Sequence, residues 1–587
     1  MTGAEYIVEF LYRHHIKRVF LLTGGSCAFL VDAIARHPEM DYVCFQHEQA
    51  AAMAADSVWR VNRTVGVSVV TSGPGATNLL TGIACSYFDS IPSIHITGQV
   101  NTSETAAFLG TEVRQAGFQE TNIVDMAKPI TKYALRVSSV EELKMGLARA
   151  YRIATSGRRG PVLIDVPMNV QKEYAGEEYT EPIEEAEEAV DEKLIINSRQ
   201  RLSKLLHSSE RPLVLLGAGV GLAGIEAKAL QWLEKKRIPF VSSWNALTYF
   251  NHNSPEYYGH IGVYGNRGAN YILQNCDALL VLGSRLDNRQ RSGNTSLFAP
   301  KARILVVDID FEELKKYSSD NYETIHLDLK HFPRVIEGLN APQIDGSWLN
   351  FMQRMKGKYF GKDMSTFAQN HDSISPYAVT QRINALVDAN AVIVSETGAN
   401  LCWVYQIFHR TEQILFTSGG MSPMGYALPA SIGAKLTAPN RAVICLLGDG
   451  GFQVNIQELQ TIKHYNLDIK IVIFNNYGYG IIKQFQDAYL DGRYEASGKG
   501  YSAPDFKAVV KAYGLSYEKV NHLDQLTSAL LNQRGACVFD VTLHENTQIE
   551  PKLEIGHPIN DQFPYVNEEE FMEGNKFVLL QRAGKSL

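Results

Sequence analysis

The amino-acid sequence predicts an α/β fold of three doubly wound, parallel-sheet domains. Apolar runs of strand length alternate with helix-length patterns along almost all of the 587 residues, and this alternation is typical of parallel sheets covered by helices. Two polar stretches, residues 172–192 and 340–372, divide the pattern into three units. The first and third units share an outline, because each places a glycine-rich turn after a central strand.

The predicted elements follow one another in a regular order. An N-terminal domain, residues 1–171, contains a helix that begins at Glu48 and ends near Trp59. A central domain follows at 190–335, a third domain at 365–550, and a polar tail at 551–587. The apolar runs that indicate strands most clearly are 18–22, 42–45, 65–71, 93–97, 212–216, 391–395, 442–447 and 469–474.

The composition excludes several classes of protein. The formal net charge is −7 without a long run of one sign, so we expect no nucleic-acid partner and no attraction to an anionic membrane. No apolar stretch of about 18 residues is present to span a bilayer, and the N-terminus lacks the pattern of a signal peptide. The seven cysteines are scattered without a C-x-x-C pair, which is typical of reduced thiols and favours a cytoplasmic location.

The strongest chemical signal lies in the third domain. Asp449 follows a buried strand within a run of glycines, and Asn476 closes the next predicted strand. Because the carboxyl ends of neighbouring parallel strands share one edge of a sheet, we expect these two side chains to lie close together. Their oxygens suit Mg²⁺, and the glycines let the backbone approach a phosphate group. The alternative is two ordinary strand–helix turns that happen to contain Asp and Asn.

This pattern resembles the thiamine-diphosphate-binding motif, in which Gly-Asp-Gly is followed one strand later by Asn-Asn. The resemblance implies thiamine diphosphate and Mg²⁺ as cofactors, and a catalytic glutamate after an early strand, which Glu48 matches. Glu48 would hydrogen-bond the pyrimidine ring of the cofactor, which itself supplies the electron sink. The alternative is a glutamate favoured at a helix start by the helix dipole. The metal site would comprise Asp449, Asn476 and Gly478, and the diphosphate would lie near Gly448, Gly450, Gly451, Tyr479 and Gly480.

Other segments match the same family. The turn 72–78 resembles the one that packs against the pyrimidine ring, and the loop 417–425 resembles the one that carries a bulky residue between the two rings. Here that residue is Met424, for which the alternative is a core-filling side chain. The further cofactor contacts that the resemblance implies are Gly24, Gly25, Thr71, Gly73, Pro74, Asn78, Thr397, Gly398, Ala399, Asn400, Ser422 and Met424.

Over nearly the whole chain the resemblance is nearest to acetolactate synthase large subunits. In that group Gln99, Phe118 and Gln119 would line the substrate pocket as catalytic residues beside Glu48. The central domain resembles the FAD-binding domain of these synthases, although a Gly-x-Gly turn alone is common in α/β sheets and some relatives have lost the flavin. Arg285 would pair with the FAD diphosphate, and Asp308 would pair with a ribose or adenine edge. The implied FAD contacts are Arg158, Gly217, Gly219, Gly265, Gly283, Arg285, Asp308 and Asp328.

Several features differ from ordinary acetolactate synthases. Met168 replaces the usual lysine, the segment 110–118 is longer and carries Arg114, and Phe485 replaces a tryptophan that favours a larger acceptor. The tail differs too, and these features resemble a sister group that adds a two-carbon unit from pyruvate to a nucleotide-linked deoxysugar.

The resemblance therefore implies a homodimer or homotetramer that decarboxylates a 2-oxo acid and transfers the two-carbon unit to a second carbonyl. The sequence does not name that acceptor. A plain 2-oxo acid decarboxylase, an oxidase of the same fold and a catalytically silent relative are the alternatives.

Overall fold

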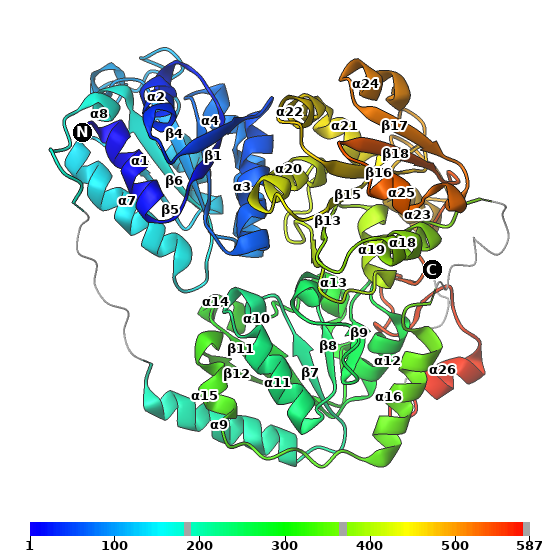
Figure 1. Ribbon diagram of the computed structural model, residues 1–587. Helices are drawn as coiled ribbons and strands as arrows, with labels where there is room; N and C mark the ends of the chain where they lie inside the picture. Colours follow the sequence, from blue (N-terminus) through cyan, green and yellow to red (C-terminus); the bar gives the residue numbers. More distant parts are fainter. Residues whose placement is uncertain (181–189, 363–372, 579–587) are drawn as a thin grey trace.

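The computed structural model describes residues 1–180, 190–362 and 373–578. Within them lie three six-stranded parallel sheets, each covered by helices (Figure 1). The predicted class, α/β with three doubly wound domains, is confirmed. Residues 181–189 of the predicted linker, the start of the predicted third domain at 365–372 and the end of the tail at 579–587 lie outside the described residues. No described helix is both long and apolar enough to cross a bilayer.

The N-terminal sheet has the strand order β2-β1-β3-β4-β6-β5. Strands β3, β4 and β6 are buried along their whole length, which explains why their sequences are continuous apolar runs without alternation. Phe45 and Thr71 lie just beyond the strands predicted to contain them, and β4 continues to Gln99. The elements are α1 (Gly3–Arg13), β1 (Arg18–Leu22), α2 (Ala28–Arg36), β2 (Asp41–Cys44), α3 (Glu48–Asn62), β3 (Gly66–Val70), α4 (Pro74–Asn78), α5 (Leu80–Asp89), β4 (Ser93–Gln99), α6 (Ile123–Ala127), β5 (Tyr133–Arg136), α7 (Val140–Thr155), β6 (Val162–Pro167) and α8 (Met168–Lys172).

The C-terminal sheet has the order β14-β13-β15-β16-β18-β17. Counted from its own first strand, this is the order of the N-terminal sheet, so the likeness of outline seen in the sequence is a likeness of topology. The elements are α18 (Pro376–Leu386), β13 (Val392–Ser395), α19 (Ala399–Ile407), β14 (Ile414–Phe416), α20 (Ala427–Thr437), β15 (Val443–Gly448), α21 (Asp449–Val454), α22 (Leu459–His464), β16 (Ile469–Asn475), α23 (Gly480–Tyr489), α24 (Phe506–Ala512), β17 (Ser516–Val520), α25 (Ser528–Leu531) and β18 (Cys537–Thr542).

The central sheet has a different order, β12-β11-β10-β7-β8-β9. The order reverses between β7 and β10, and the loops after these two strands therefore open a crevice at the carboxyl edge. The elements are α9 (Glu192–His207), β7 (Pro212–Leu216), α10 (Gly219–Leu222), α11 (Glu226–Lys236), β8 (Phe240–Ser242), β9 (Tyr257–His260), α12 (Arg267–Asn275), β10 (Ala278–Leu282), α13 (Asn288–Arg291), β11 (Arg303–Asp308), α14 (Phe311–Leu314), β12 (Tyr322–His326), α15 (Phe332–Ile336) and α16 (Gly346–Tyr359).

Two segments with polar sequences are folded parts of the core. The stretch 340–372, predicted only to separate two domains, contains α16, whose Trp348 and Phe351 are buried against the central domain. The tail forms an antiparallel pair, β19 (Lys552–Leu553) with β20 (Gln562–Phe563), and then α26 (Glu568–Gly574). Helix α26 lies beside α12 and α16 (Figure 1) and buries Phe571. A few apolar side chains at helical spacing were enough to dock each segment, although its mean composition is polar.

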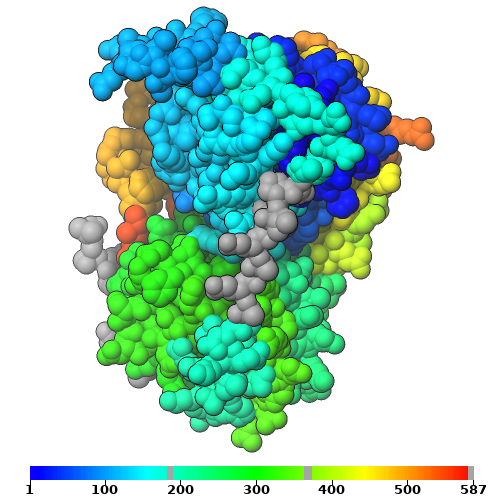
Figure 2. Space-filling model, turned by 90° about the vertical axis from the view of Figure 1, so that its left-hand side faces the viewer, coloured from blue at the N-terminus to red at the C-terminus, as the bar shows by residue number. Residues whose placement is uncertain are grey.

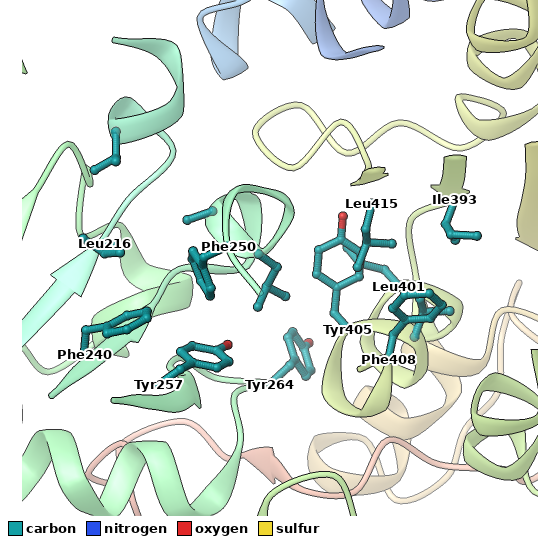
Figure 3. Close-up of a cluster of buried hydrophobic side chains, with 14 of the residues drawn as sticks. Leu216, Phe240, Phe250, Tyr257, Tyr264, Ile393, Leu401, Tyr405, Phe408 and Leu415 are labelled. Atoms are coloured by element: carbon teal, nitrogen blue, oxygen red, sulfur yellow. The ribbon is translucent and has the colours of Figure 1, made fainter. Parts of the chain in front are cut away.

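The domains form two stacked layers rather than a row. In side view the N-terminal domain lies above the central domain (Figure 2), and helices α3 and α20 pack together between the N-terminal and C-terminal domains (Figure 1). These helices approach closely because small residues meet: a Cβ atom on Gly433 would lie 2.4 Å from the carbonyl oxygen of Ala54. Figure 3 shows aromatic and aliphatic side chains of the central and C-terminal domains in one continuous cluster, with Tyr264 and Tyr405 near the boundary.

A buried ion pair joins all three domains. The Asp89 carboxylate accepts hydrogen bonds from the Arg60 guanidinium at 2.8 Å, from the Asn245 amide of the central domain at 3.1 Å, and from the backbone N–H groups of Gly419 and Gly420 in the C-terminal domain at 2.9 and 2.8 Å. The Asp89 and Arg60 side chains are both buried. Arg60 also pairs with the buried Asp56 carboxylate at 2.7 Å, so loss of Asp89 would remove one of the two carboxylates that balance this guanidinium.

We predict that Asp89→Ala lowers the free energy of unfolding by about 3–5 kcal/mol, because the Asn245 amide and two backbone N–H groups lose their acceptor and Arg60 keeps only one of its two carboxylate partners, Asp56. The matched control is Asp32→Ala, which removes an exposed i,i+4 pair with Arg36 and is expected to change stability by less than about 1 kcal/mol. Thermal unfolding followed by circular dichroism measures both. Equal midpoints for the two variants would contradict the central role of Asp89.

Candidate active site

The predicted metal loops meet at the carboxyl edge of the C-terminal sheet. Strands β15 and β16 are neighbours, with Gly448 in register with Phe474, so the loops that follow them lie side by side. The Asp449 carboxylate accepts hydrogen bonds from the Gly478 N–H at 3.0 Å and from the Tyr501 hydroxyl at 2.7 Å. Only 1% of Asp449 is exposed, and burial raises the pKa of its carboxyl to about 6.

Asn476 completes this pair of loops. It is buried, and its amide nitrogen has no hydrogen-bond partner within the described ranges. A Cβ atom on Gly480 would lie 2.5 Å from that nitrogen, and one on Gly450 would lie 2.6 Å from the Tyr479 ring. Glycine is therefore required at both positions for the two loops to approach.

A third loop comes from β13 and the start of α19. Its Thr397 hydroxyl contacts the Ser422 hydroxyl, and Gly398 has a φ of +81°, a conformation that favours glycine. The buried Glu396 carboxylate accepts from the backbone N–H groups of Tyr426 and Ala427 at 3.3 and 3.1 Å, and burial raises its pKa to about 7. Glu396 thus fixes the start of α20, and with it the preceding loop that carries Met424.

Residues of all three loops line one cavity. The predicted residues that line it are Thr397, Gly398, Ala399, Asn400, Ser422, Met424, Gly448, Asp449, Gly450, Gly451, Asn476, Gly478, Tyr479 and Gly480. The sequence patterns did not single out several others that also line it, among them Arg289, Lys552, Phe88 and Trp244. Among the described residues that line this cavity, only Phe88 belongs to the N-terminal domain.

The predicted residues of the N-terminal domain form a separate cluster at the carboxyl edge of their own sheet. Only 8% of Glu48 is exposed, and its carboxylate accepts from the Asn78 amide at 2.9 Å. A Cβ atom on Gly75 would lie 3.4 Å from the Glu48 carboxylate, so Pro74 and the rest of this turn lie against Glu48. Thr71 fits closely against Gly24, where a Cβ atom would lie 2.5 Å away, whereas Gly25 has open space around it.

The three residues predicted to line the substrate pocket have different surroundings. Gln99 is buried, and its amide donates to the Asp165 carboxylate at 3.1 Å and to the Thr121 carbonyl at 3.0 Å. Its side chain thus ties the end of β4 to β6 and to the backbone at Thr121, and its contact with a substrate stays a prediction. Gln119, with a φ of +64°, lies 3.0 Å from where a Gly73 Cβ would be. Phe118 projects outward and is 84% exposed.

A second cavity lies at the carboxyl edge of the central sheet. The residues predicted for a flavin that line it are Arg158, Gly219, Gly283, Arg285, Asp308 and Asp328. Gly217 and Gly265 do not line it. A Cβ atom on Gly217 would lie 2.1 Å from the Gly283 carbonyl oxygen, so Gly217 permits close strand packing, and the Gly265 carbonyl accepts from Gln562 at 3.1 Å.

Two observations refine the flavin prediction. The Arg158 guanidinium is already paired with Asp310 at 2.5 Å and with Glu313 at 3.3 Å, so it closes the cavity wall rather than offering a free cation. Phe88, Trp244, Arg285, Asp287 and Gly419 line both cavities, which therefore meet.

Comparison with known proteins decides the family. Residues 1–126, 199–334 and 396–541 match the N-terminal TPP binding domain, the central domain and the C-terminal TPP binding domain of thiamine pyrophosphate enzymes. The chain belongs to the thiamine pyrophosphate enzyme family. The large subunit of acetolactate synthase isozyme 2 from Escherichia coli K12 is 32% identical, covering 95% of this chain and 98% of that protein. The isozyme 1 large subunit from the same strain is 34% identical and covers 94% of this chain and 96% of its own length. The Lactococcus lactis large subunit is 32% identical and covers 94% of this chain and 95% of its own length.

The chain is thus a TPP-dependent enzyme of the acetolactate synthase type, where TPP is another name for thiamine diphosphate. The first cavity fits the diphosphate end of TPP, because glycines line it and the partnerless amide nitrogen of Asn476 is free to donate to an oxygen. Among the described residues, no group of three or more His, Cys, Asp or Glu side chains could hold a metal. One buried carboxylate suits Mg²⁺, which takes its other ligands from diphosphate and water.

The sequence analysis missed candidate site residues that do not follow a predicted strand. Tyr501 reaches Asp449 from a long loop after α23, and Lys552 comes from the tail. Arg289 lies four residues after the predicted Arg285 and, like Arg285, lines the first cavity.

We predict that Asp449→Ala abolishes the Mg²⁺-dependent part of TPP affinity, because the diphosphate charge would lose the cation that Asp449 holds. Calorimetric titration of TPP with and without Mg²⁺ measures this. Asp505→Ala, at the exposed start of α24, serves as the control and is expected to bind TPP normally. An unchanged Mg²⁺ dependence in Asp449→Ala would place the metal elsewhere.

Proposed function

We propose that this chain is a TPP- and Mg²⁺-dependent carboligase, which decarboxylates a 2-oxo acid, pyruvate by its resemblance to the synthases, and transfers the two-carbon unit to a second carbonyl. The observation that carries this proposal is the convergence of Asp449, Asn476 and the Met424 loop on one cavity. Three cationic side chains, Arg285, Arg289 and Lys552, also line it. Anionic 2-oxo acids suit such a cavity. When bound, TPP supplies the carbon nucleophile and the electron sink.

The residues of this chain would bind TPP and Mg²⁺ and orient the two rings of the cofactor. Mg²⁺ would be held against the diphosphate by the Asp449 carboxylate, the Asn476 amide oxygen and the Gly478 carbonyl oxygen. The N-termini of α19 and α23 offer free N–H groups to the oxygens of the diphosphate. Met424 approaches the diphosphate loop, since its methyl group lies 3.4 Å from where a Gly450 Cβ would be, and it would support the cofactor between its rings. Glu48 would exchange a proton with the pyrimidine ring through its carboxylate, and Asn78 orients that carboxylate.

The separation of Glu48 from the Mg²⁺ cavity supports an oligomer. In one chain, Glu48 lies in a cluster of the N-terminal domain, and only Phe88 of that domain reaches the cavity. A second copy would supply the missing Glu48, as in a homodimer or a dimer of dimers with sites at the subunit interface. The exposed Phe108, Leu109 and Phe118 on the segment after β4 are apolar side chains that such an interface would cover.

The acceptor divides the proposal into two versions. A second 2-oxo acid would make the chain an acetolactate synthase in activity. A nucleotide-linked keto-deoxysugar would place it in polysaccharide biosynthesis, and two observations favour room for a bulkier acceptor: Phe485 is 42% exposed at the cavity, and Arg114 is exposed on the long segment before Phe118. Release of CO₂ without a ligated product would support a plain decarboxylase, and oxygen uptake would support an oxidase.

The test uses labelled pyruvate with TPP, Mg²⁺ and equal amounts of pyruvate, 2-oxobutyrate and a nucleotide-linked 4-keto-deoxysugar as acceptors. We predict a ligated product in wild type and a loss of at least ~10²-fold in turnover for Glu48→Gln, with TPP binding retained. When Glu48→Gln and Asp449→Ala chains are co-expressed, mixed dimers should regain about a quarter of the wild-type activity, because half of the dimers are mixed and each has one intact site.

Absence of a ligated product would refute the carboligase. Absence of recovery in the mixed preparation, with mixed dimers verified by affinity tags, would place Glu48 and Asp449 of one chain in the same site. Capture of most label by 2-oxobutyrate would favour the acetolactate synthase version over the sugar version.

We also propose that the second cavity binds FAD. Gly219 and Gly283 pack against each other with no room for side chains, which leaves backbone open to a dinucleotide, and Arg285 and Asp308 line the same space. Since this cavity has walls from all three domains, the flavin would join them.

We predict that the gently purified protein is yellow, and that added FAD at about 100 times its Kd raises the free energy of unfolding by about 2.7 kcal/mol. The absorption spectrum and the thermal midpoint measure this, with riboflavin, which lacks the adenine and diphosphate, as the control ligand. A colourless protein that FAD does not stabilise would refute the flavin and leave TPP binding untouched.

A further inference from the structure

A lysine of the tail faces the active-site cavity without a partner. Lys552, the first residue of β19, is 7% exposed and lines the same cavity as Asp449, Met424 and Phe485. Within the part of the chain that the structure describes, no hydrogen bond or ion pair reaches its ammonium group. A buried charge of this kind is unfavourable unless it is compensated, so its position points to a ligand.

The backbone around Lys552 is held on both sides. The Gln406 amide donates to the Pro551 carbonyl at 2.7 Å, and the Leu553 N–H donates to the Val263 carbonyl at 2.8 Å. Further along, the Ile555 N–H donates to the Tyr489 hydroxyl at 2.7 Å. The tail is thus fixed to the central domain and to helices α19 and α23, and the lysine is presented from a rigid base.

The charges around Lys552 leave it available to an anion. Arg289 and Cys402 are its neighbours from α13 and α19, and the two nearby carboxylates are those of Glu554 and Asp487. Neither carboxylate lies within ion-pair distance, and both have partners: Glu554 accepts from Tyr565, and Asp487 accepts from Tyr494 and from Gln548. Burial lowers the pKa of Lys552, the direction expected for an ammonium group that lacks a counter-ion.

Lys552 lies on the substrate side of the cavity. The predicted diphosphate contacts are at the first residues of α19 and α23. Cys402 and Asp487, two of the four groups whose charges act on Lys552, lie further along the same helices. At 1.5 Å per residue, Asp487 lies about 10 Å along α23 from Gly480. Phe485, at the wall where the acceptor would lie, is on the same part of α23.

We propose that Lys552 binds the anionic group of the acceptor substrate, a carboxylate or a phosphate, and so selects charged over neutral carbonyl acceptors. This inference rests on the proposed carboligase function. It assigns a role in specificity to the C-terminal hairpin. The two anions share the chemistry that an ammonium group recognises, and acceptors of both kinds distinguish them.

The experiment compares wild-type, Lys552→Met and Lys552→Arg holoenzymes with pyruvate as donor. The acceptors are 2-oxobutyrate, which carries a carboxylate, glyceraldehyde 3-phosphate, which carries a phosphate, and propanal, which is neutral. Lys552→Met should raise KM for the preferred anionic acceptor about 10- to 100-fold, with KM for propanal unchanged and much of the loss rescued by Lys552→Arg. The anion whose KM rises more identifies the natural group. Lys356→Met, which removes a partly buried lysine of α16 outside the cavity, is the control.

A second readout separates this inference from the proposed function. Decarboxylation of pyruvate with ferricyanide as the oxidant needs TPP but no acceptor, and Lys552→Met should retain it, together with wild-type affinity for TPP. An equal rise in KM for charged and neutral acceptors in Lys552→Met would overturn the role of Lys552. Weaker TPP binding, or an unchanged KM for both anionic acceptors, would overturn it too. Ligation to propanal alone in wild type would overturn it as well. If wild type shows no TPP-dependent decarboxylation, the proposed function itself fails, and the role of Lys552 fails with it.

Discussion

The ion pair of Asp89 with Arg60 is the constraint on which the arrangement of the domains depends. One carboxylate accepts from a helix of its own domain, from Asn245 of the central domain and from two N–H groups of the loop that leads to Met424. The Arg60 guanidinium in turn donates to the Thr417 carbonyl at 2.9 Å. Because this loop also borders both cavities at Gly419, a single buried charge holds a wall that the two cavities share.

The parts of the fold that repeat a local rule could be predicted from the sequence. Buried parallel strands need apolar runs, and the turns at their carboxyl ends need glycine, so β1 and β7 were located to the residue and Asp449 was correctly expected beside the loop of Asn476. Gly219 and Gly283, two of the predicted glycines, line a cavity at the carboxyl edge of the central sheet, and its occupation by FAD stays a prediction.

The parts that depend on distant contacts could not be predicted. Asp89 and Arg60 look like solvated helix residues until three domains close over them. Gln99 is the last residue of β4, and its amide donates to Asp165 on the adjacent strand β6, a contact that the sequence does not indicate. Lys552 belongs to a stretch whose polar composition indicates a tail, and only the hydrogen bonds to Gln406 and Val263 place it at the cavity.

The shared strand order of the N-terminal and C-terminal sheets determines which elements join the two domains. Helices α3 and α20, which hold these domains together, each connect the second strand of their own sheet to the third, so the same element of each domain forms the contact. The two domains therefore meet through corresponding elements. Their strand-end loops differ in sequence: Asp449 follows the third strand of the C-terminal sheet, whereas Thr71 follows the third strand of the N-terminal sheet.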